Sequence, residues 1–238
     1  MIKISNLSKS FNKNKVIHNL NLEIKEGLIT ALVGPNGSGK TTLLKCILGL
    51  TYPDKESRVL LSGFEYLNKN GIKEIGYMPQ TPLFPQNLKV KEIIQILKNL
   101  EEKETIYEEN LKDELEINKF ENKYFGELSG GMKQKVNILQ CFSSEKKFYI
   151  IDEPTASLDP HISFYLKNLL KERRKKGSSI LFTSHIMSEV DEIADRVIVM
   201  VEGKLILDET PLEILNKSNT TNMESALRSY WMVGVNHA

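Results

Sequence analysis

The fold of this 238-residue chain is decided by the stretch Gly34-Pro35-Asn36-Gly37-Ser38-Gly39-Lys40-Thr41, which Thr42 continues. Its glycines let backbone N–H groups converge on phosphates at the positively polarised start of a helix. Lys40 adds a positive charge, and the Thr41 hydroxyl can hold Mg²⁺. The segment 28–33 before it is typical of a buried strand, and apolar residues at helical spacing follow it until Gly49. Strand, loop and helix together predict a site for nucleotide phosphates.

The bulk composition narrows the class of protein. A content of 40% hydrophobic residues can fill a genuine core, so disorder is not expected. The 32 basic and 31 acidic side chains give a net charge of +1, so no overall field draws the protein to nucleic acid, and we expect no nucleic-acid partner. Cys46 and Cys141 lie in apolar helical patterns without further cysteines, which indicates reduced, buried thiols in a cytosolic protein.

The start of the chain and its apolar runs argue against a membrane-embedded protein. Residues 1–5 alternate like a strand and lack the apolar block of a signal peptide. No apolar run approaches the roughly 18 residues that a membrane-spanning helix needs. We therefore expect any contact with a membrane to go through another subunit.

Short apolar runs predict two kinds of sheet. Alternation at 2–4 and again at 20–24 predicts an amino-terminal antiparallel sheet with one face in water. The runs 148–151 and 179–183 predict buried strands of a parallel sheet, joined by an amphipathic crossover helix. The last turn of that helix, 171–176, is basic. It either stabilises the helix end or forms a nucleic-acid patch, and the neutral chain favours the first interpretation.

The expected organisation is one large domain with an insertion. Residues 1–215 form the domain, and a helical subdomain at about 81–134 is inserted in it. The insertion carries one apolar helical stripe from Val90 to Leu100, and a charged segment, 101–113, follows the stripe.

The carboxyl-terminal part closes the domain and adds a tail. Glu202-Gly203 predicts a hairpin between two apolar runs. Residues 216–238 form the tail, in which we expect a polar linker at 216–222 and a short helix at 223–231.

Two adjacent acids follow the apolar run at 148–151. Asp152 ends the run, so its carboxylate emerges at the carboxyl edge of the sheet, where ligands of open α/β folds bind. It is therefore the natural protein ligand for Mg²⁺ together with Thr41. The alternative, in which Asp152 and Glu153 merely cap the next segment, is disfavoured by the phosphate loop.

Between the phosphate loop and these acids lies the segment Leu128-Ser129-Gly130-Gly131-Met132-Lys133-Gln134. A phosphate loop, then Leu-Ser-Gly-Gly and then Ile-Asp-Glu-Pro resembles the ATP-binding subunit of an ABC transporter. The resemblance covers Ile2 to about Leu215. It implies an α/β P-loop NTPase fold, with a RecA-like, mostly parallel sheet, an N-terminal antiparallel β subdomain and the inserted helical subdomain.

The resemblance implies roles for three side chains at strand ends. Glu153 orients and polarises the attacking water, His185 contacts the γ-phosphate, and Gln80 touches Mg²⁺ and connects to the helical subdomain. By itself, a histidine at a strand end is more often structural, and Gln80 is an ordinary loop amide. The segment Pro82-Leu83-Phe84-Pro85 is either a docking groove for a membrane subunit or packed core, and analogy favours docking.

The resemblance also implies an aromatic side chain that stacks on the adenine base of ATP. Phe11 lies where the family has an aromatic residue, usually tyrosine, that stacks on adenine. Phenylalanine can serve because stacking needs only the face of the ring. This departure leaves base selectivity open, and an aromatic residue in a strand is by default part of the core.

The segment Ser129-Gly130-Gly131 implies a second protomer. It opens a helix whose free N–H groups can hold a phosphate, although the chain already has a phosphate loop. The resemblance implies a head-to-tail dimer, in which Ser129 and Gly131 of one protomer contact the γ-phosphate that is bound by Lys40 of the other. Asp159 lies in the loop that crosses to that protomer, and Lys135 stands where the family commonly has arginine.

We therefore expect an ATPase that requires Mg²⁺ and drives a substrate through a separate membrane-spanning permease subunit by ATP-dependent dimerisation. Such a protein is cytoplasmic and peripheral on the inner face of the cell membrane. The tail resembles exporter ATPases of the ABC-2 type. Some relatives work without a membrane, on ribosomes or nucleic-acid machines, but these usually have two cassettes or a long coiled coil. A P-loop kinase leaves the Leu-Ser-Gly-Gly segment unexplained.

Overall fold

The computed structural model describes residues 1–61, 64–65, 69–100, 109–155 and 157–233. Residues 101–108 of the charged segment and 234–238 of the expected tail lie outside the described residues. Within the described part of the chain, no helix combines the length and the apolar character needed to cross a bilayer.

An antiparallel sheet forms the amino-terminal part of the fold. β1 (Ile2–Phe11) pairs with β2 (Asn14–Ile24) and with β4 (Arg58–Leu61), which pairs with β5 (Phe64–Glu65). Buried and exposed positions alternate toward the end of β2, as a sheet with one wet face requires. The predicted antiparallel sheet is confirmed.

The central sheet has six strands in the order β10-β9-β3-β8-β7-β6. All neighbours are parallel except β10, which runs antiparallel to β9. β3, β7 and β8 are buried along their whole length, in agreement with their unbroken apolar runs. The strand bounds are β3 (Ile29–Val33), β6 (Ile75–Met78), β7 (Phe148–Asp152), β8 (Ser179–Thr183), β9 (Arg196–Val201) and β10 (Lys204–Glu209).

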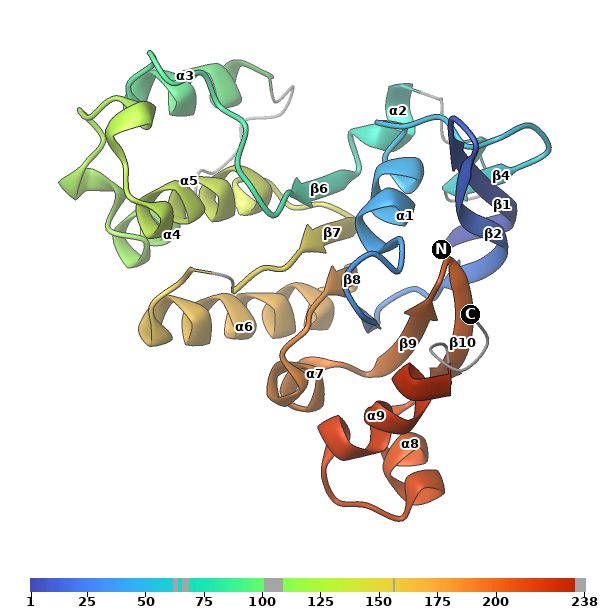
Figure 1. Cartoon of the computed structure of the whole chain (residues 1–238). Helices are drawn as coiled ribbons and strands as arrows, with labels where there is room; N and C mark the ends of the chain where they lie inside the picture. Colours follow the sequence, from blue (N-terminus) through green and yellow to red (C-terminus); the bar gives the residue numbers. More distant parts are fainter. Residues whose placement is uncertain (62–63, 66–68, 101–108, 156, 234–238) are drawn as a thin grey trace.

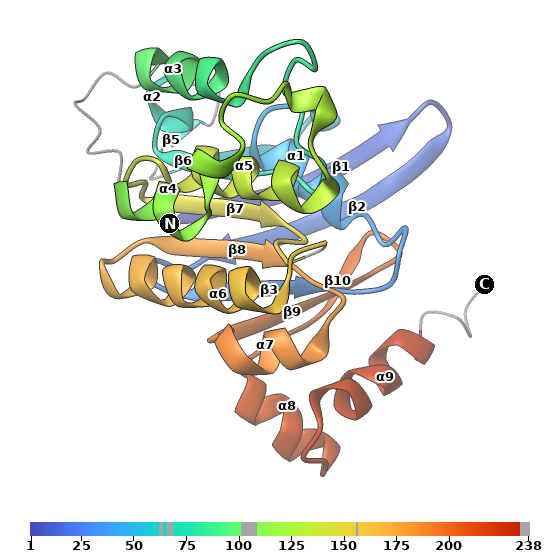
Figure 2. The same ribbon diagram turned by 90° about the vertical axis from the view of Figure 1, so that its left-hand side faces the viewer.

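Helices cover both faces of the central sheet (Figure 1). α1 (Lys40–Ile47) lies between this sheet and the antiparallel sheet, and its buried side chains share a core with β1, β2 and β4. α5 (Gly130–Phe142), α6 (Pro160–Lys175) and α7 (Met187–Ile193) share a second core with the other face (Figure 2). Packing on both faces fixes the carboxyl ends of the strands relative to α1.

The segment 81–134 carries most of the remaining helices, and Figure 1 shows them gathered on one side of the central sheet. Val90, Ile93 and Ile94 are buried, but Leu100, at the end of the expected apolar stripe, is 74% exposed. The bounds here are α3 (Val90–Leu100), α4 (Glu109–Glu114), and the 3₁₀ turns η1 (Ile117–Lys119) and η2 (Phe125–Glu127), with α2 (Lys69–Ile72) before β6.

The hairpin of β9 and β10 turns at Glu202 and Gly203, as predicted. Both residues have positive φ angles, 46° and 74°, which a tight hairpin turn that follows the twist of its strands requires. The turn also contacts the phosphate loop, because the Gly203 N–H donates to the Ser38 carbonyl at 3.0 Å.

The chain after β10 is more helical than its polar composition suggests. α8 (Pro211–Ser218) takes up the first residues of the linker expected at 216–222, and α9 (Met223–Val233) follows. α9 contacts α7, and its residues Met223, Ala226 and Leu227 are buried in the second core, which also contains side chains of α5, α6 and α7. The part of the tail that the structure describes, up to residue 233, therefore packs against the folded domain.

The basic end of α6 is occupied by ion pairs. Arg173 is 1% exposed, and its Nη1 atom lies 3.2 Å from Glu145 Oε1, which also accepts from Lys176 at 3.0 Å. Gly177 follows with a φ of 94°, the conformation of a glycine after a helix end. These contacts favour the interpretation that the basic residues 171–176 stabilise the end of the helix, over a nucleic-acid patch.

Candidate nucleotide-binding site

The predicted site residues lie at the carboxyl ends of four neighbouring strands, at one edge of the central sheet. β3, β8, β7 and β6 are consecutive and parallel, so their carboxyl ends meet at the same edge (Figure 2). The phosphate loop follows β3, Asp152 ends β7 and Glu153 comes directly after it, His185 follows β8, and Gln80 follows β6. The structure therefore brings together the phosphate loop and the four polar residues expected beside it, where ligands of such sheets bind.

The phosphate loop leads directly into α1. Gly39 is the N-cap of this helix, with a φ of 102°. A Cβ atom on Gly34 would lie 2.0 Å from the Met200 carbonyl oxygen, so only glycine fits there. Lys40 is buried, and its ammonium group donates to the carbonyls of Gly34 at 2.8 Å and Pro35 at 3.1 Å. Burial lowers the pKa of Lys40, and the charges of Glu153 and Asp152 oppose that shift.

Hydroxyl and carboxylate oxygens converge next to α1. The Thr41 hydroxyl donates to Asp152 Oδ2 at 2.9 Å, and the Thr183 hydroxyl donates to Asp152 Oδ1 at 2.6 Å. Asp152 is 2% exposed, so both oxygens are oriented by these contacts. Magnesium prefers hard oxygen ligands and is usually bound by one or two carboxylates together with substrate phosphates. The donor set of Thr41 and Asp152 fits Mg²⁺.

Glu153 stands at the centre of a polar cluster. Its Oε2 atom accepts from the Gln80 side chain at 2.7 Å, and its Oε1 atom lies 3.5 Å from His185 Nδ1. Its φ of 50° is uncommon outside glycine, and its N–H donates to the Thr183 hydroxyl at 2.9 Å. A carboxylate that is held by an amide and faces an exposed histidine can orient a water molecule and polarise it.

The segment Ser129-Gly130-Gly131 lies in another part of the chain. Ser129 is the N-cap of α5, and its hydroxyl accepts from the Met132 N–H at 3.3 Å. Figure 1 shows α5 beside the helical segment and α1 between the two sheets. One chain therefore carries two separate helix starts suited to phosphate, and the start of α1 is the one that the phosphate loop leads into.

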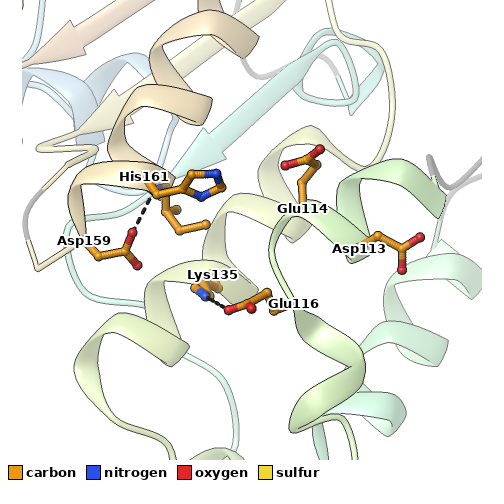
Figure 3. A pocket seen from close by; sticks show the side chains of 7 residues that line it. Asp113, Glu114, Glu116, Lys135, Asp159 and His161 are labelled. Carbon is orange, nitrogen blue, oxygen red and sulfur yellow. Dashed lines mark hydrogen bonds and ion pairs between the residues drawn. The ribbon is translucent and has the colours of Figure 1, made fainter.

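Asp159 lies close to this second helix start. Its side chain caps α6 by accepting from the Ile162 N–H at 2.9 Å, and a Cβ on Gly131 would lie 3.3 Å from the Ser157 carbonyl. An open hollow of ≈ 600 Å³ is found here, between α4, α5 and the start of α6 (Figure 3). It is separate from the phosphate loop, and the polar residues that line it are Asp113, Glu114, Glu116, Lys135, Asp159 and His161.

Phe11 lies at the end of β1 and is 48% exposed, so it is not a core residue. It pairs with Asn14 of β2, two positions before Val16, whose carbonyl would lie 3.2 Å from a Cβ on Gly39. The hairpin of β1 and β2 therefore carries Phe11 to the neighbourhood of the phosphate loop. The Lys9 ammonium lies 4.8 Å from the centroid of the Phe11 ring.

Sequence reasoning missed three polar residues at this site. From the sequence, Thr183 is only the last residue of an apolar run. In the structure its hydroxyl contacts both the Asp152 carboxylate and the Glu153 backbone N–H. Gln134 and Asn137 of α5 are buried and donate to the carbonyls of Gln80 and Pro79. The available signal was a pair of amides on the inward face of an otherwise apolar helix.

Comparison with known proteins agrees with this geometry. The family model described as ABC transporter matches residues 17–156. The SkfA peptide export ATP-binding protein SkfE of Bacillus subtilis (strain 168) is 35% identical over 214 residues, which cover 87% of this chain and 88% of that protein.

Solved structures carry the same fold. One described as the ATP binding subunit of an ABC transporter superposes with a TM-score of 0.89 at 25% identity, and covers 96% of this chain and 98% of its own. The dimeric post-hydrolysis state of the ATP-binding cassette MJ0796, bound to ADP and Pi, has a TM-score of 0.78 at 25% identity, with 88% and 98% covered. The chain belongs to the ABC transporter family and has the fold of its ATP-binding cassettes.

Proposed function

We propose that this protein hydrolyses ATP and uses the energy to drive a substrate through a separate membrane-spanning subunit. The observation that carries the proposal is the meeting of Lys40, Thr41, Asp152 and Glu153 at one sheet edge. Transfer of a phosphoryl group to water requires positioning and charge compensation, and this edge supplies both. The phosphate loop and Lys40 bind the phosphates of ATP.

Glu153 is the catalytic carboxylate in this proposal. It orients and polarises the attacking water, and the contacts of its carboxylate with Gln80 and His185 support that role. Thr41, Asp152 and Gln80 are the residues that would hold Mg²⁺, and the metal would neutralise the charge of the β- and γ-phosphates. The stacking of Phe11 on adenine is part of the same proposal, supported by the exposure of its ring.

The two phosphate-binding helix starts favour a head-to-tail dimer. Ser129, Gly130 and Gly131 of one protomer meet the γ-phosphate in the other, and Asp159 crosses between them. The dimeric cassette of similar fold supports this arrangement. In this proposal, binding of ATP closes the dimer and hydrolysis reopens it.

The surface beside Gln80 suits a membrane subunit. Leu83 is 86% exposed, and its neighbour Phe84 is anchored edge-on against Phe125 at a centroid distance of 5.3 Å. Ile96 and Leu100 of α3 are also exposed apolar side chains on the same subdomain. We propose that the membrane subunit docks here, which places the protein in the cytoplasm against the inner face of the membrane. Similarity to the peptide export protein SkfE favours export.

A single carboxylate-to-amide change tests the ATPase. Glu153→Gln keeps the size of the side chain but removes the charge that polarises water. We expect turnover to fall by at least about a hundredfold with ATP binding retained, because one preorganised polar group at a reacting centre contributes that much. We also expect the variant to accumulate as an ATP-bound dimer in gel filtration. Glu224→Gln in α9 is the matched control, and near-normal ATPase activity of Glu153→Gln would remove Glu153 from its role.

A further inference from the structure

Two buried amide side chains on α5 reach across to the end of β6. Gln134 is 4% exposed and Asn137 is 1% exposed. The Gln134 side chain donates to the Gln80 carbonyl at 3.0 Å, and the Asn137 side chain donates to the Pro79 carbonyl at 2.7 Å. Both acceptors are main-chain atoms, so these bonds fix the backbone at the point where β6 ends.

The two amides also bind each other. Asn137 Nδ2 donates to Gln134 Oε1 at 2.9 Å, so one NH₂ group serves two acceptors. Among the residues that the structure describes, none donates to the buried Asn137 Oδ1 atom. A buried acceptor without a donor destabilises a fold, and an apolar side chain at position 137 would have no such acceptor. A buried amide with one unsatisfied end is a feature that calls for a functional explanation.

The backbone held by this pair carries the side chain that touches Glu153. Gln80 donates to Glu153 Oε2 at 2.7 Å through its amide, while its own carbonyl is held by Gln134. A continuous path of hydrogen bonds therefore runs from α5 through Gln80 to the carboxylate. α5 is also the helix that begins at Ser129-Gly130-Gly131.

We propose that Gln134 and Asn137 are positioning residues, which place the Gln80 amide against Glu153 and tie that placement to the position of α5. This inference rests on the proposed function, in which Glu153 polarises the water. In the head-to-tail dimer the start of α5 completes the site of the other protomer. The amide pair then links the phosphate bound at one site to the carboxylate of the other, so that the two sites respond together.

Nearly isosteric apolar substitutions test the pair. Gln134→Met removes the amide and keeps an unbranched side chain, and Asn137→Leu removes the second amide. Gln140→Leu, on the partly exposed side of the same helix, is the control. We expect each test variant to lower kcat about tenfold, the effect of losing one well-placed hydrogen bond. KM and the affinity for ATP should stay within about twofold, because the phosphate loop is untouched.

A double-mutant cycle with Gln80→Ala separates positioning from general damage. If Gln134 acts through Gln80, Gln134→Met lowers kcat in the wild-type background but by less than about twofold in the Gln80→Ala background. We also expect the Hill coefficient for ATP to fall toward one in Gln134→Met. Equal losses of kcat in both backgrounds, or full kcat in Gln134→Met, would overturn the proposal. If Asn137→Leu does not fold, Gln134→Met alone decides.

The wild-type chain and Glu153→Gln are measured in the same series. A wild-type chain without ATPase activity, or a fully active Glu153→Gln, would refute the proposed function itself. A wild-type chain that hydrolyses ATP, an inactive Glu153→Gln and a Gln134→Met variant with full kcat would refute only the positioning role.

Discussion

Thr183 holds Asp152 in place through a 2.6 Å hydrogen bond from its hydroxyl to Oδ1. The same hydroxyl accepts from the N–H of Glu153 at 2.9 Å. One buried side chain on β8 therefore orients the expected metal ligand on β7 and supports the strained backbone of the expected catalytic residue, whose φ is 50°. This relation depends on the register of the two strands, in which Asp152 lies opposite Thr183.

Removal of this hydroxyl should slow turnover with little effect on ATP binding. Thr183→Val keeps the shape of the side chain, but it leaves the Glu153 N–H and one Asp152 oxygen without their partner. We expect kcat to fall about tenfold, from the loss of hydrogen bonds to a charged group and to the backbone. Thr183→Ser should restore most of the activity in a steady-state ATPase assay. A Thr183→Val enzyme with wild-type kcat would contradict the supporting role.

The contact between Thr41 and Asp152 predicts a Mg²⁺ effect on nucleotide affinity. In the wild-type protein we expect ATP to bind more tightly with MgCl₂ than with EDTA, because a metal held by both residues links the phosphates to the protein. Thr41→Val and Asp152→Asn should reduce this difference at least about tenfold, whereas Thr41→Ser should keep it. Isothermal titration calorimetry with and without Mg²⁺ measures the difference. An unchanged Mg²⁺ effect in Asp152→Asn would remove that carboxylate from the metal site.

The fold could be predicted because its main signals are local. The phosphate loop, the unbroken apolar runs of β7 and β8, and the turn residues Glu202 and Gly203 each show their structure within a few residues. The contacts of Thr183 and Gln134 could not be predicted, because they depend on strand register and helix packing. Both are set by contacts between distant parts of the chain.

The start of α8 carries a local sequence signal of its own. Thr210-Pro211-Leu212-Glu213 has the pattern of a capping box, with proline at the first helical position. The structure shows the reciprocal bonds, since Thr210 Oγ1 accepts from the Glu213 N–H at 3.3 Å and Glu213 accepts from the Thr210 N–H at 2.8 Å. The polar composition of 216–222 indicates a linker, whereas residues 216–218 form the last turn of α8, the helix that this capping box begins.

The exposed ring of Phe11 predicts a contribution to ATP affinity. Phe11→Ala should raise KM for ATP roughly tenfold with kcat almost unchanged, because stacking of a base on an aromatic ring contributes about 1–3 kcal/mol. Phe11→Tyr should keep the wild-type KM, since both rings offer a face. Tyr124→Ala is a matched control, because Tyr124 is also exposed and also has a lysine over its ring, Lys89 at 5.5 Å. An unchanged KM in Phe11→Ala would exclude Phe11 from the base site.

The ion pairs of Glu116 predict a loss of stability in acid. Hydrogen bonds from Lys119 and Lys135 lower the pKa of Glu116 from 4.5 to about 2. Because the pKa in the folded state lies below the pKa in the unfolded state, the stabilisation is complete above pH 4.5 and disappears as the pH falls toward about 2. Glu116→Gln should therefore be less stable than the wild type at neutral pH. The difference in free energy of unfolding should shrink as the pH falls through this window.

Urea unfolding at several pH values measures this difference. The effect should weaken in high salt, because Glu116 is exposed and its ion pairs are screened. Glu114→Gln is the matched control, since none of the described residues pairs with Glu114 through an ion pair. Lys135 lies in α5 and Glu116 is the N-cap of η1, so their contact at 2.9 Å joins α5 to the turn that follows α4. A pH-independent difference between wild type and Glu116→Gln would show that this contact carries no charge-dependent stability.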